Sequence, residues 1–219
     1  MSTTETHMQP WTRDQMAQRA AQDIQEGWFV NLGIGIPTLV ANHVPTDKEV
    51  IFHAENGVVG MGSAPDAEHI EPWLINAGKQ YVTLRAGGCY VHHADSFSMI
   101  RGGHLDLCVL GAYDVNTRGD IANWALSEDD TAPAVGGAMD LAASAKRLWV
   151  VMEHVNKKGE PRLVNECRYP LTASGSVDRI YTNLAVLDVR QTHFQVLDMA
   201  PGVTPEYLIA HTEAELRFD

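Results

Sequence analysis

The stretch WFVNLGIGIPTLVANHV, residues 28–44, decides the fold, because a strand, a glycine turn and a helix follow one another in it. Its two glycines mark the turn, and Pro37 suits the first turn of the helix that comes next. The run EVIFHAE, residues 49–55, predicts a second strand. Strands and helices continue to alternate over residues 1–155. This alternation predicts an α/β fold, an open three-layer α/β/α sandwich with a mostly parallel sheet.

A helix is predicted before this unit, over residues 12–27. Thr12 and Gln15 have the spacing of a capping box, and the apolar residues that follow fall on one helical face. Gly27 is expected to end the helix.

Further elements are predicted after the unit. The run LDLCVLGAYDV, residues 105–115, is almost continuously apolar, as expected for a strand covered on both faces, with Cys108 as a small buried side chain. A short helix is expected over residues 94–103, with Asp95 or Ser96 as its cap. Other expected elements are a helix over 136–147, a strand over 148–155, two strands within 178–202 and a last helix capped by Thr204.

Composition limits the class of protein. The 219 residues suit one domain, which we place over residues 12–219 behind a flexible leader over residues 1–11. The net charge of −12 disfavours nucleic acid and anionic membrane as partners. No window is apolar enough to span a membrane, and the first residues do not form a secretion signal. Three cysteines without a CxxC pair favour a reducing compartment, so we expect a cytoplasmic protein.

Several site classes are poorly supported. The turn after Asn31 has two glycines, but Thr38 stands where a dinucleotide fingerprint needs its third. Asn31 itself falls at the carboxyl end of a strand, where α/β folds bind ligands. The histidines show no HxxxH or HExxH spacing, so no metal is expected, and one near a strand end, such as His53, is more often hydrogen-bonded within the structure. No GxSxG elbow is present.

The run FHAENGVVGMG, residues 52–62, places a lone carboxylate, Glu55, where a strand breaks into a glycine-rich turn. A strand-end glutamate is most often a surface acid or a cap. As a nucleophile, a carboxylate with a pKa of about 4.3 is weak and needs an activated acyl group such as a thioester. Attack gives a mixed anhydride, which the returning thiolate converts into a thioester on the glutamate, in two half-reactions. Glycine turns such as ENGVVGMG and VGGAMD supply backbone N–H donors for the oxyanion.

These residues carry a resemblance to a known family. FHAENGVVGMG resembles the glutamate signature of the β subunit of family I CoA-transferases, the succinyl-CoA:3-oxoacid type. The likeness runs from Thr12 to about Ala210, and NLGIGIPTLVA, LINAGK, DSFSMIRGGHLDL, GDIANW and GGAMDLAASAK match the family in the same order. One departure is Ala54, where the family usually has serine before the glutamate. Residues 13–44 and 92–106 are most similar to bacterial members that act on 3-oxoadipate in the β-ketoadipate pathway of aromatic-compound breakdown.

The resemblance implies roles for particular residues. Glu55 is expected to be the acyl-accepting nucleophile and the site of a glutamyl-CoA thioester. Gly136 and Gly137 match the glycine loop that offers backbone N–H groups to the reacting carbonyl, although the bland alternative is that they only cap a helix. Asn31 is expected to face the glutamate, and Lys79 to contact coenzyme A or substrate unless it is a solvated turn lysine.

The resemblance also implies substrates and a partner. Succinyl-CoA and a 3-oxoacid are the expected substrates, no resident cofactor is expected, and coenzyme A is a transiently covalent substrate. The family's α subunit supplies the rest of the active site, so we expect a heteromer, α2β2, that is inactive as the β chain alone.

Alternatives remain open at this point. The acceptor is 3-oxoadipate or acetoacetate, and a second substrate carboxylate would want a cation, for which Arg85, Arg101 and Arg118 are available. The fold is shared with sugar-phosphate isomerases, which would use Glu55 as a general base and need a basic phosphate-binding turn. A non-catalytic sensor domain is the third reading, and the intact ENG and GGAMD runs argue against it.

Overall fold

The computed structural model describes residues 8–126 and 135–218. Its main feature is a 10-stranded sheet with the strand order β13-β12-β11-β10-β8-β5-β1-β2-β3-β4. The strands of this sheet are β1 (Phe29–Leu32), β2 (Ile51–Ala54), β3 (Val58–Met61), β4 (Leu84–Tyr90), β5 (Leu107–Leu110), β8 (Leu148–Met152), β10 (Val177–Thr182), β11 (Ala185–Val189), β12 (Phe194–Met199) and β13 (Leu216–Arg217).

The centre of the sheet is parallel, antiparallel pairs flank it on both sides, and the edge strand β13 pairs parallel to β12. The central strands pair parallel to one another, in the order β2, β1, β5, β8 and β10. Antiparallel pairs extend the sheet through β3 and β4 on one side and through β11 and β12 on the other. The prediction of an α/β fold with a mostly parallel sheet is therefore confirmed.

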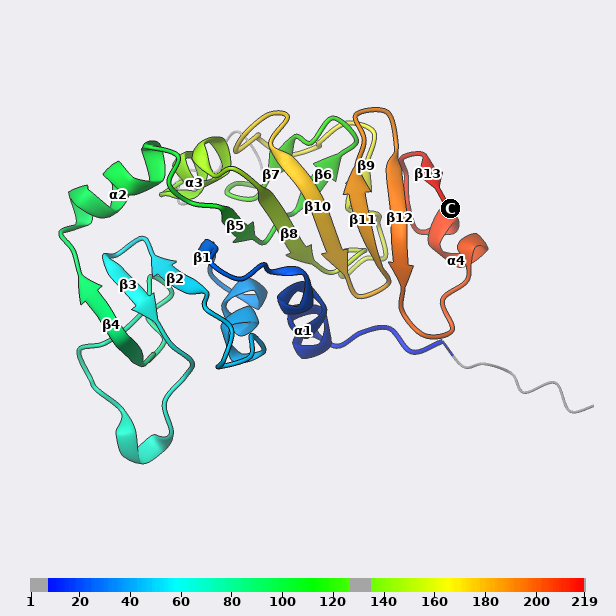
Figure 1. Cartoon of the computed structure of the whole chain (residues 1–219). Helices are drawn as coiled ribbons and strands as arrows, with labels where there is room; N and C mark the ends of the chain where they lie inside the picture. Colours follow the sequence, from blue (N-terminus) through cyan, green and yellow to red (C-terminus); the bar gives the residue numbers. More distant parts are fainter. Residues whose placement is uncertain (1–7, 127–134, 219) are drawn as a thin grey trace, which may run out of the picture.

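Helices cover both faces of the parallel centre (Figure 1). One face carries α1 (Arg13–Asp23) and η1, a 3-10 helix over Ile36–Asn42. The other carries α2 (His93–Arg101) and α3 (Ala138–Ser144), which pack against each other. The remaining helices of the described residues are η2 (Ala67–His69) and α4 (Pro205–Ala210).

The side chains of the central strands alternate between two hydrophobic clusters, as the two-residue period of a strand requires. On β5, Leu107 and Val109 belong to the cluster under α1, whereas Cys108 and Leu110 belong to the cluster under α2 and α3. Strand β8 alternates in the same way. Burial on both faces explains why residues 105–115 are continuously apolar, and Cys108 is fully buried as expected.

A second sheet of three short strands, in the order β7-β6-β9, was not expected from the sequence. It consists of β6 (Asp114–Asn116), β7 (Ile121–Ala122) and β9 (Leu163–Val164). Asp114 is fully buried there, and the Arg168 guanidinium donates to both of its carboxylate oxygens, at 2.7 and 3.0 Å. This ion pair holds the segment around Arg168 against β6.

Several predicted element ends need correction. The capping box of Thr12 and Gln15 is present, but α1 ends at Asp23, before Gly27. The helix that was expected to have Pro37 in its first turn is a 3-10 helix. Helix α2 is capped by the side chain of His92 and not by Asp95 or Ser96, because the helix starts earlier than predicted.

The cap of the last helix is confirmed, and the described start of the chain makes two backbone contacts. The Thr204 side chain accepts a hydrogen bond from the backbone of Tyr207. Residues 1–7 of the expected leader lie outside the described residues. In the rest of it, the Gln9 N–H donates to the Pro201 carbonyl and the Trp11 N–H to the Asn183 carbonyl, both at 2.8 Å.

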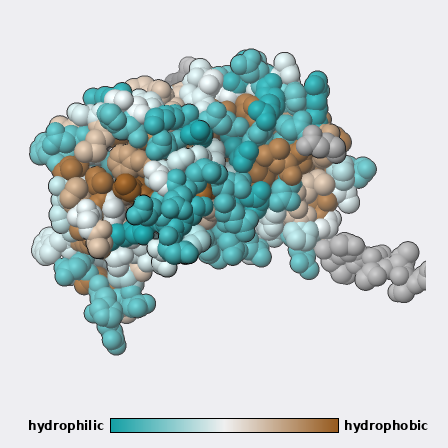
Figure 2. All heavy atoms as spheres, viewed as in Figure 1, coloured by the Kyte–Doolittle hydropathy of each residue, from teal (hydrophilic) through white to brown (hydrophobic). Residues whose placement is uncertain are grey.

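The surface carries one projecting segment, between β3 and β4, at the lower left of Figure 1. Figure 2 shows that this segment is mostly hydrophilic. Its exposed large hydrophobic side chains are Ile70, Tyr81 and Trp73, of which Trp73 has 94% of its surface exposed. No helix within the described residues is both long and apolar enough to cross a lipid bilayer.

The buried ion pair generates a stability prediction. Replacing Arg168 with methionine leaves the Asp114 carboxylate buried without a counter-charge, so we expect the free energy of unfolding to fall by about 3 kcal/mol. Urea unfolding followed by circular dichroism measures this change. The control is Arg217→Met, which breaks the exposed pair with Glu215 and is expected to cost less than about 1 kcal/mol. Equal losses in the two variants would contradict the assignment.

Candidate active site

A cavity of about 570 Å³ lies at the carboxyl ends of the parallel strands and is the site candidate. The last residues of β1, β5 and β8 line it, together with the residue that follows β2. The chain leaves β1 toward β2 on one side, then returns to build β5, β8 and β10 on the other side. The crevice beside β1 is therefore the point where the strand order reverses, which is where open α/β sheets bind ligands.

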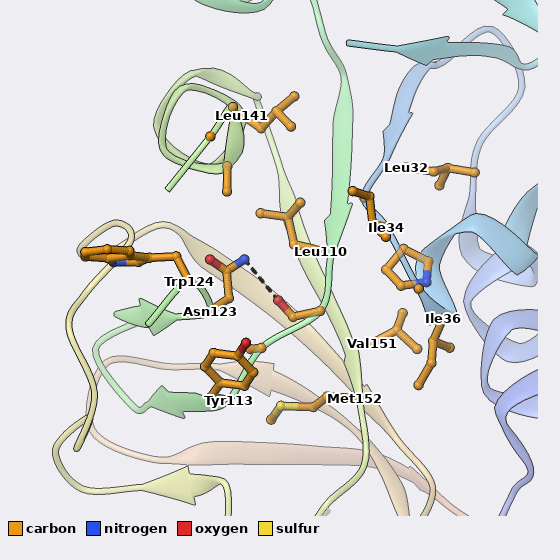
Figure 3. A pocket seen from close by; sticks show the side chains of 18 of the residues that line it. Leu32, Ile34, Ile36, Leu110, Tyr113, Asn123, Trp124, Leu141, Val151 and Met152 are labelled. Carbon is orange, nitrogen blue, oxygen red and sulfur yellow. Dashed lines mark hydrogen bonds between the residues drawn. The ribbon is translucent and has the colours of Figure 1, made fainter. Parts of the chain in front are cut away.

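The walls of the cavity are largely apolar (Figure 3). Ile34 comes from the connection between β1 and η1, Ile36 from the start of η1, Leu141 from α3, and Met152 from the end of β8. Among the polar groups of the lining, the Asn123 side chain donates a hydrogen bond to the Gly111 carbonyl at 3.1 Å. An apolar lining with a few fixed polar groups is typical of small-molecule sites.

Glu55 follows the last residue of β2 and lines this cavity. The turn after it is closed by Gly57, whose N–H donates to the Ala54 carbonyl at 2.9 Å and whose φ is +109°. The Val91 N–H in turn donates to the Gly57 carbonyl at 2.9 Å, and a Cβ at Gly57 would overlap the Val91 carbonyl oxygen. Only glycine therefore allows the turn to pack against the chain that enters α2.

The carboxylate of Glu55 lies in a narrow slot. A Cβ added to Gly137 would overlap Glu55 Oε2 and would come within 2.9 Å of Phe97 Cζ, so Gly137 and Phe97 both lie close to the carboxylate. Burial raises the pKa of Glu55 above its ordinary value; the electrostatic interaction with His93 opposes this rise and that with Asp140 adds to it. Poor hydration of this kind makes a carboxylate more basic and more nucleophilic.

An ion pair ties together the two segments beside this slot. The Arg101 guanidinium, on α2, donates to both oxygens of Asp140, on α3, at 2.8 and 3.1 Å. Phe97 lies on α2 and Gly137 immediately precedes α3. The ion pair therefore joins the two helices that position Phe97 and Gly137, the residues on either side of the slot.

Buried polar groups stand behind Glu55. Asn31 Nδ2 lies 2.9 Å from His53 Nδ1, His53 Nε2 lies 2.8 Å from Ser96 Oγ, and Ser96 Oγ donates to the Glu55 carbonyl at 2.9 Å. Burial lowers the pKa of His53 to about 4, so its ring is neutral at pH 7. His53 is thus a hydrogen-bonded structural histidine, as expected, and not a free base.

The structure brings most of the predicted site residues together. Glu55, Gly136, Gly137 and Asn31 line the same cavity. The Asn31 amide, however, is already engaged with His53, so Asn31 supports the site from behind. Lys79 is exposed and does not line the cavity; it stands in a turn with a φ of +61°. Within residues 8–126 and 135–218, no group of three His, Cys, Asp or Glu side chains is placed to hold a metal ion.

The arginines proposed for a second substrate carboxylate lie elsewhere. Arg85 donates to the Val50 carbonyl, Arg101 pairs with Asp140, and Arg118 pairs with two carboxylates, those of Asp120 and Glu166. None of the three arginines lines the cavity.

Two other arginines do line the cavity. Arg13 pairs with Glu153 at 3.3 Å, whereas the Arg162 Nη1 donates only to the Ala112 carbonyl, at 3.4 Å, among the residues that the structure describes. No local sequence signal marks Arg162, because it reaches the cavity through the fold.

Comparisons with known proteins show the family of this chain. The model of the family described as Coenzyme A transferase matches residues 13–211. The chain is 53% identical to one of the subunits of the 3-oxoadipate CoA-transferase of Acinetobacter baylyi, over 94% of each chain. It is 43% identical to one of the subunits of the succinyl-CoA:3-ketoacid coenzyme A transferase of Helicobacter pylori, over 93% of this chain and 97% of the relative.

The fold is shared with a solved structure of an acyl-CoA transferase from Escherichia coli O157:H7, with a TM-score of 0.73 at 20% identity. The match covers 95% of this chain but spans only 42% of that longer chain.

The narrow slot generates a prediction for Gly137. A methyl group at this position displaces the Glu55 carboxylate, so we expect Gly137→Ala to lower CoA-transferase turnover by at least about 100-fold. Steady-state kinetics of the assembled enzyme measures the loss. Gly111→Ala is the control on the same cavity wall, because its added Cβ would have 3.9 Å to the nearest atom, the Val151 carbonyl oxygen. Activity of Gly137→Ala equal to that of the control would show that the slot is wider in solution.

Proposed function

This chain belongs to the coenzyme A transferase family, and from that premise we propose that it is the β subunit of an enzyme that moves coenzyme A from succinyl-CoA to 3-oxoadipate. The observation that carries the proposal is the position of Glu55, half-buried at the carboxyl end of β2 and packed against Gly137 on the cavity wall. A carboxylate so placed is shielded from bulk water and open to a ligand in the cavity. We propose a single domain over residues 12–219 for this function.

The chemistry proceeds by two exchanges at one carboxylate. A Glu55 oxygen attacks the thioester carbonyl of succinyl-CoA, the C–S bond breaks, and the thiolate of coenzyme A leaves. The thiolate then attacks the Glu55 carbonyl of the mixed anhydride, releasing succinate and leaving a glutamyl-CoA thioester. A carboxylate of 3-oxoadipate attacks this thioester, and the thiolate returns to the new acyl group. Glu55 is restored, and no net proton is taken up.

The surroundings of Glu55 support this sequence of steps. Backbone N–H groups of the Gly136–Gly137 turn border the cavity and are the candidates to stabilise each oxyanion. The apolar wall limits the water that would hydrolyse the anhydride or the thioester. No resident cofactor is required, because coenzyme A is itself the substrate that becomes covalently bound.

A partner chain is part of the proposal. The relatives from Acinetobacter baylyi and Helicobacter pylori are each named as one subunit of a CoA-transferase, which supports a second chain, an α subunit. Exposed apolar side chains on this chain, including Ile34 at the cavity and Met139 on α3, offer a surface for it to cover. We propose an α2β2 assembly in the cytoplasm.

We choose between the two acceptors by comparing their charges with the charges in the cavity. 3-Oxoadipate carries a second carboxylate that acetoacetate lacks, so its recognition requires a cation in the cavity. Arg13 is already paired with Glu153, whereas Arg162 pairs with no carboxylate in the described part of the chain. Arg162 is therefore the candidate that selects 3-oxoadipate, and acetoacetate remains the alternative acceptor.

The nucleophile is tested by trapping. We expect the complex of this chain with its partner to gain the mass of covalent coenzyme A when incubated with succinyl-CoA, and borohydride to modify Glu55. Glu55→Gln should form no adduct and lose transfer activity by more than about 10⁴-fold while retaining assembly. Glu153→Gln, a carboxylate in the same cavity, is the control that keeps the adduct. An adduct on Glu55→Gln would exclude the mechanism.

The acceptor is tested at Arg162. A charged hydrogen bond contributes about 1.5–3 kcal/mol, so Arg162→Met should lower kcat/KM for 3-oxoadipate by roughly 10- to 100-fold. The value for acetoacetate should change by less than about threefold, because that substrate has no second carboxylate. Arg13→Met serves as the control, with both acceptors expected to respond alike. Equal losses for both acceptors in Arg162→Met would remove Arg162 from substrate selection.

A further inference from the structure

The polar chain behind Glu55 is sealed from solvent. His53 and Ser96 are fully buried and Asn31 is 2% exposed. It crosses three elements, since Asn31 lies on β1, His53 on β2 and Ser96 on α2. Its last acceptor is the backbone carbonyl of Glu55, at 2.9 Å from Ser96 Oγ. A buried chain of this kind places constraints on the residue at its end.

The position of every proton in the chain follows from its two ends. The Glu55 carbonyl can only accept, so the single Ser96 hydroxyl proton points to it, and Ser96 Oγ must accept from His53 Nε2–H. At the other end, Asn31 Nδ2 also lies 3.2 Å from the His53 carbonyl oxygen, which identifies this atom as the amide donor. His53 Nδ1 therefore accepts, and both ends require the neutral ring with its proton on Nε2.

The environment of His53 keeps the ring in that form. Burial lowers its pKa to about 4, so no second proton is present on Nδ1 near neutral pH to oppose the Asn31 amide. Each donor then points toward Glu55, from Asn31 through His53 to Ser96. Hydrogen bonds aligned in one direction polarise and strengthen one another.

We propose that His53 and Ser96 are positioning residues that fix the backbone of the nucleophile turn and so aim the Glu55 carboxylate into the slot beside Gly137. The other end of the turn is fixed independently, by the fit of Gly57 against Val91. The inference rests on the proposed role of Glu55 as acyl acceptor. Since the Glu55 carboxyl group is joined in turn to the succinyl group, to coenzyme A and to the acyl group of the acceptor in one cycle, its orientation has to be kept through all steps.

The experiment compares two serines on one helix. Ser96→Ala removes the donor to Glu55. Ser98→Ala is the matched control, because its hydroxyl donates only to the Ala94 carbonyl of the same helix, at 2.9 Å, among the described residues. Ser96→Cys keeps the shape of the side chain with a weaker donor. Each variant is purified with its partner chain, and adduct formation from succinyl-CoA is followed in single turnovers by rapid quench and mass spectrometry.

We expect the limiting rate of adduct formation to fall by roughly 10- to 100-fold in Ser96→Ala and by an intermediate factor in Ser96→Cys. The succinyl-CoA concentration that gives half of the limiting rate should change by less than about twofold, because the cavity itself is unaltered. Ser98→Ala should match the wild type in both quantities.

Two outcomes would overturn the inference. A limiting rate in Ser96→Ala within about twofold of Ser98→Ala would show that the hydroxyl does not aim the carboxylate, while the adduct itself would leave the role of Glu55 standing. Absence of any adduct in the wild type would instead remove the proposed function, and the positioning role with it.

Discussion

The site depends on one constraint, that parallel strands buried on both faces can present polar groups only at their ends. Strands β1, β2, β5 and β8 carry apolar side chains into two clusters, so their interiors offer no chemistry. Their carboxyl ends meet at one edge of the sheet, where the order of the strands reverses at β1. Glu55 and the glycine turns therefore converge there although they are far apart in the sequence.

A second constraint acts on the nucleophile itself. Burial disfavours the ionised form of Glu55, which is the form that attacks a thioester. Full burial would neutralise the group, and full exposure would leave it hydrated and poorly reactive. The half-buried position at the end of β2, with Gly137 and Phe97 close by and His93 opposing the effect of burial, lies between these extremes.

Local signals in the sequence predict much of this arrangement. The capping box of Thr12, the cap at Thr204 and the continuously apolar central strands each depend on neighbouring residues only, and the structure contains all three. The strands β6, β7 and β9 escape prediction because two or three residues are too few to show a period. The sequence predicts a helix cap at Asp95 or Ser96, whereas the Ser96 hydroxyl donates to the Glu55 carbonyl, a partner 41 positions away. The cavity face of Arg162 likewise depends on tertiary structure.

The ion pair between Arg101 and Asp140 has a consequence for the slot that holds the nucleophile. It joins α2 to α3 at the protein surface, where the Arg101 side chain is 65% exposed. Dissolved salt therefore weakens this ion pair, since exposed charges are screened over about 10 Å at 0.1 M salt. The width of the slot around the half-buried Glu55 carboxylate therefore depends on the ionic strength of the solution. The two charges responsible for this dependence do not contact the reacting atoms.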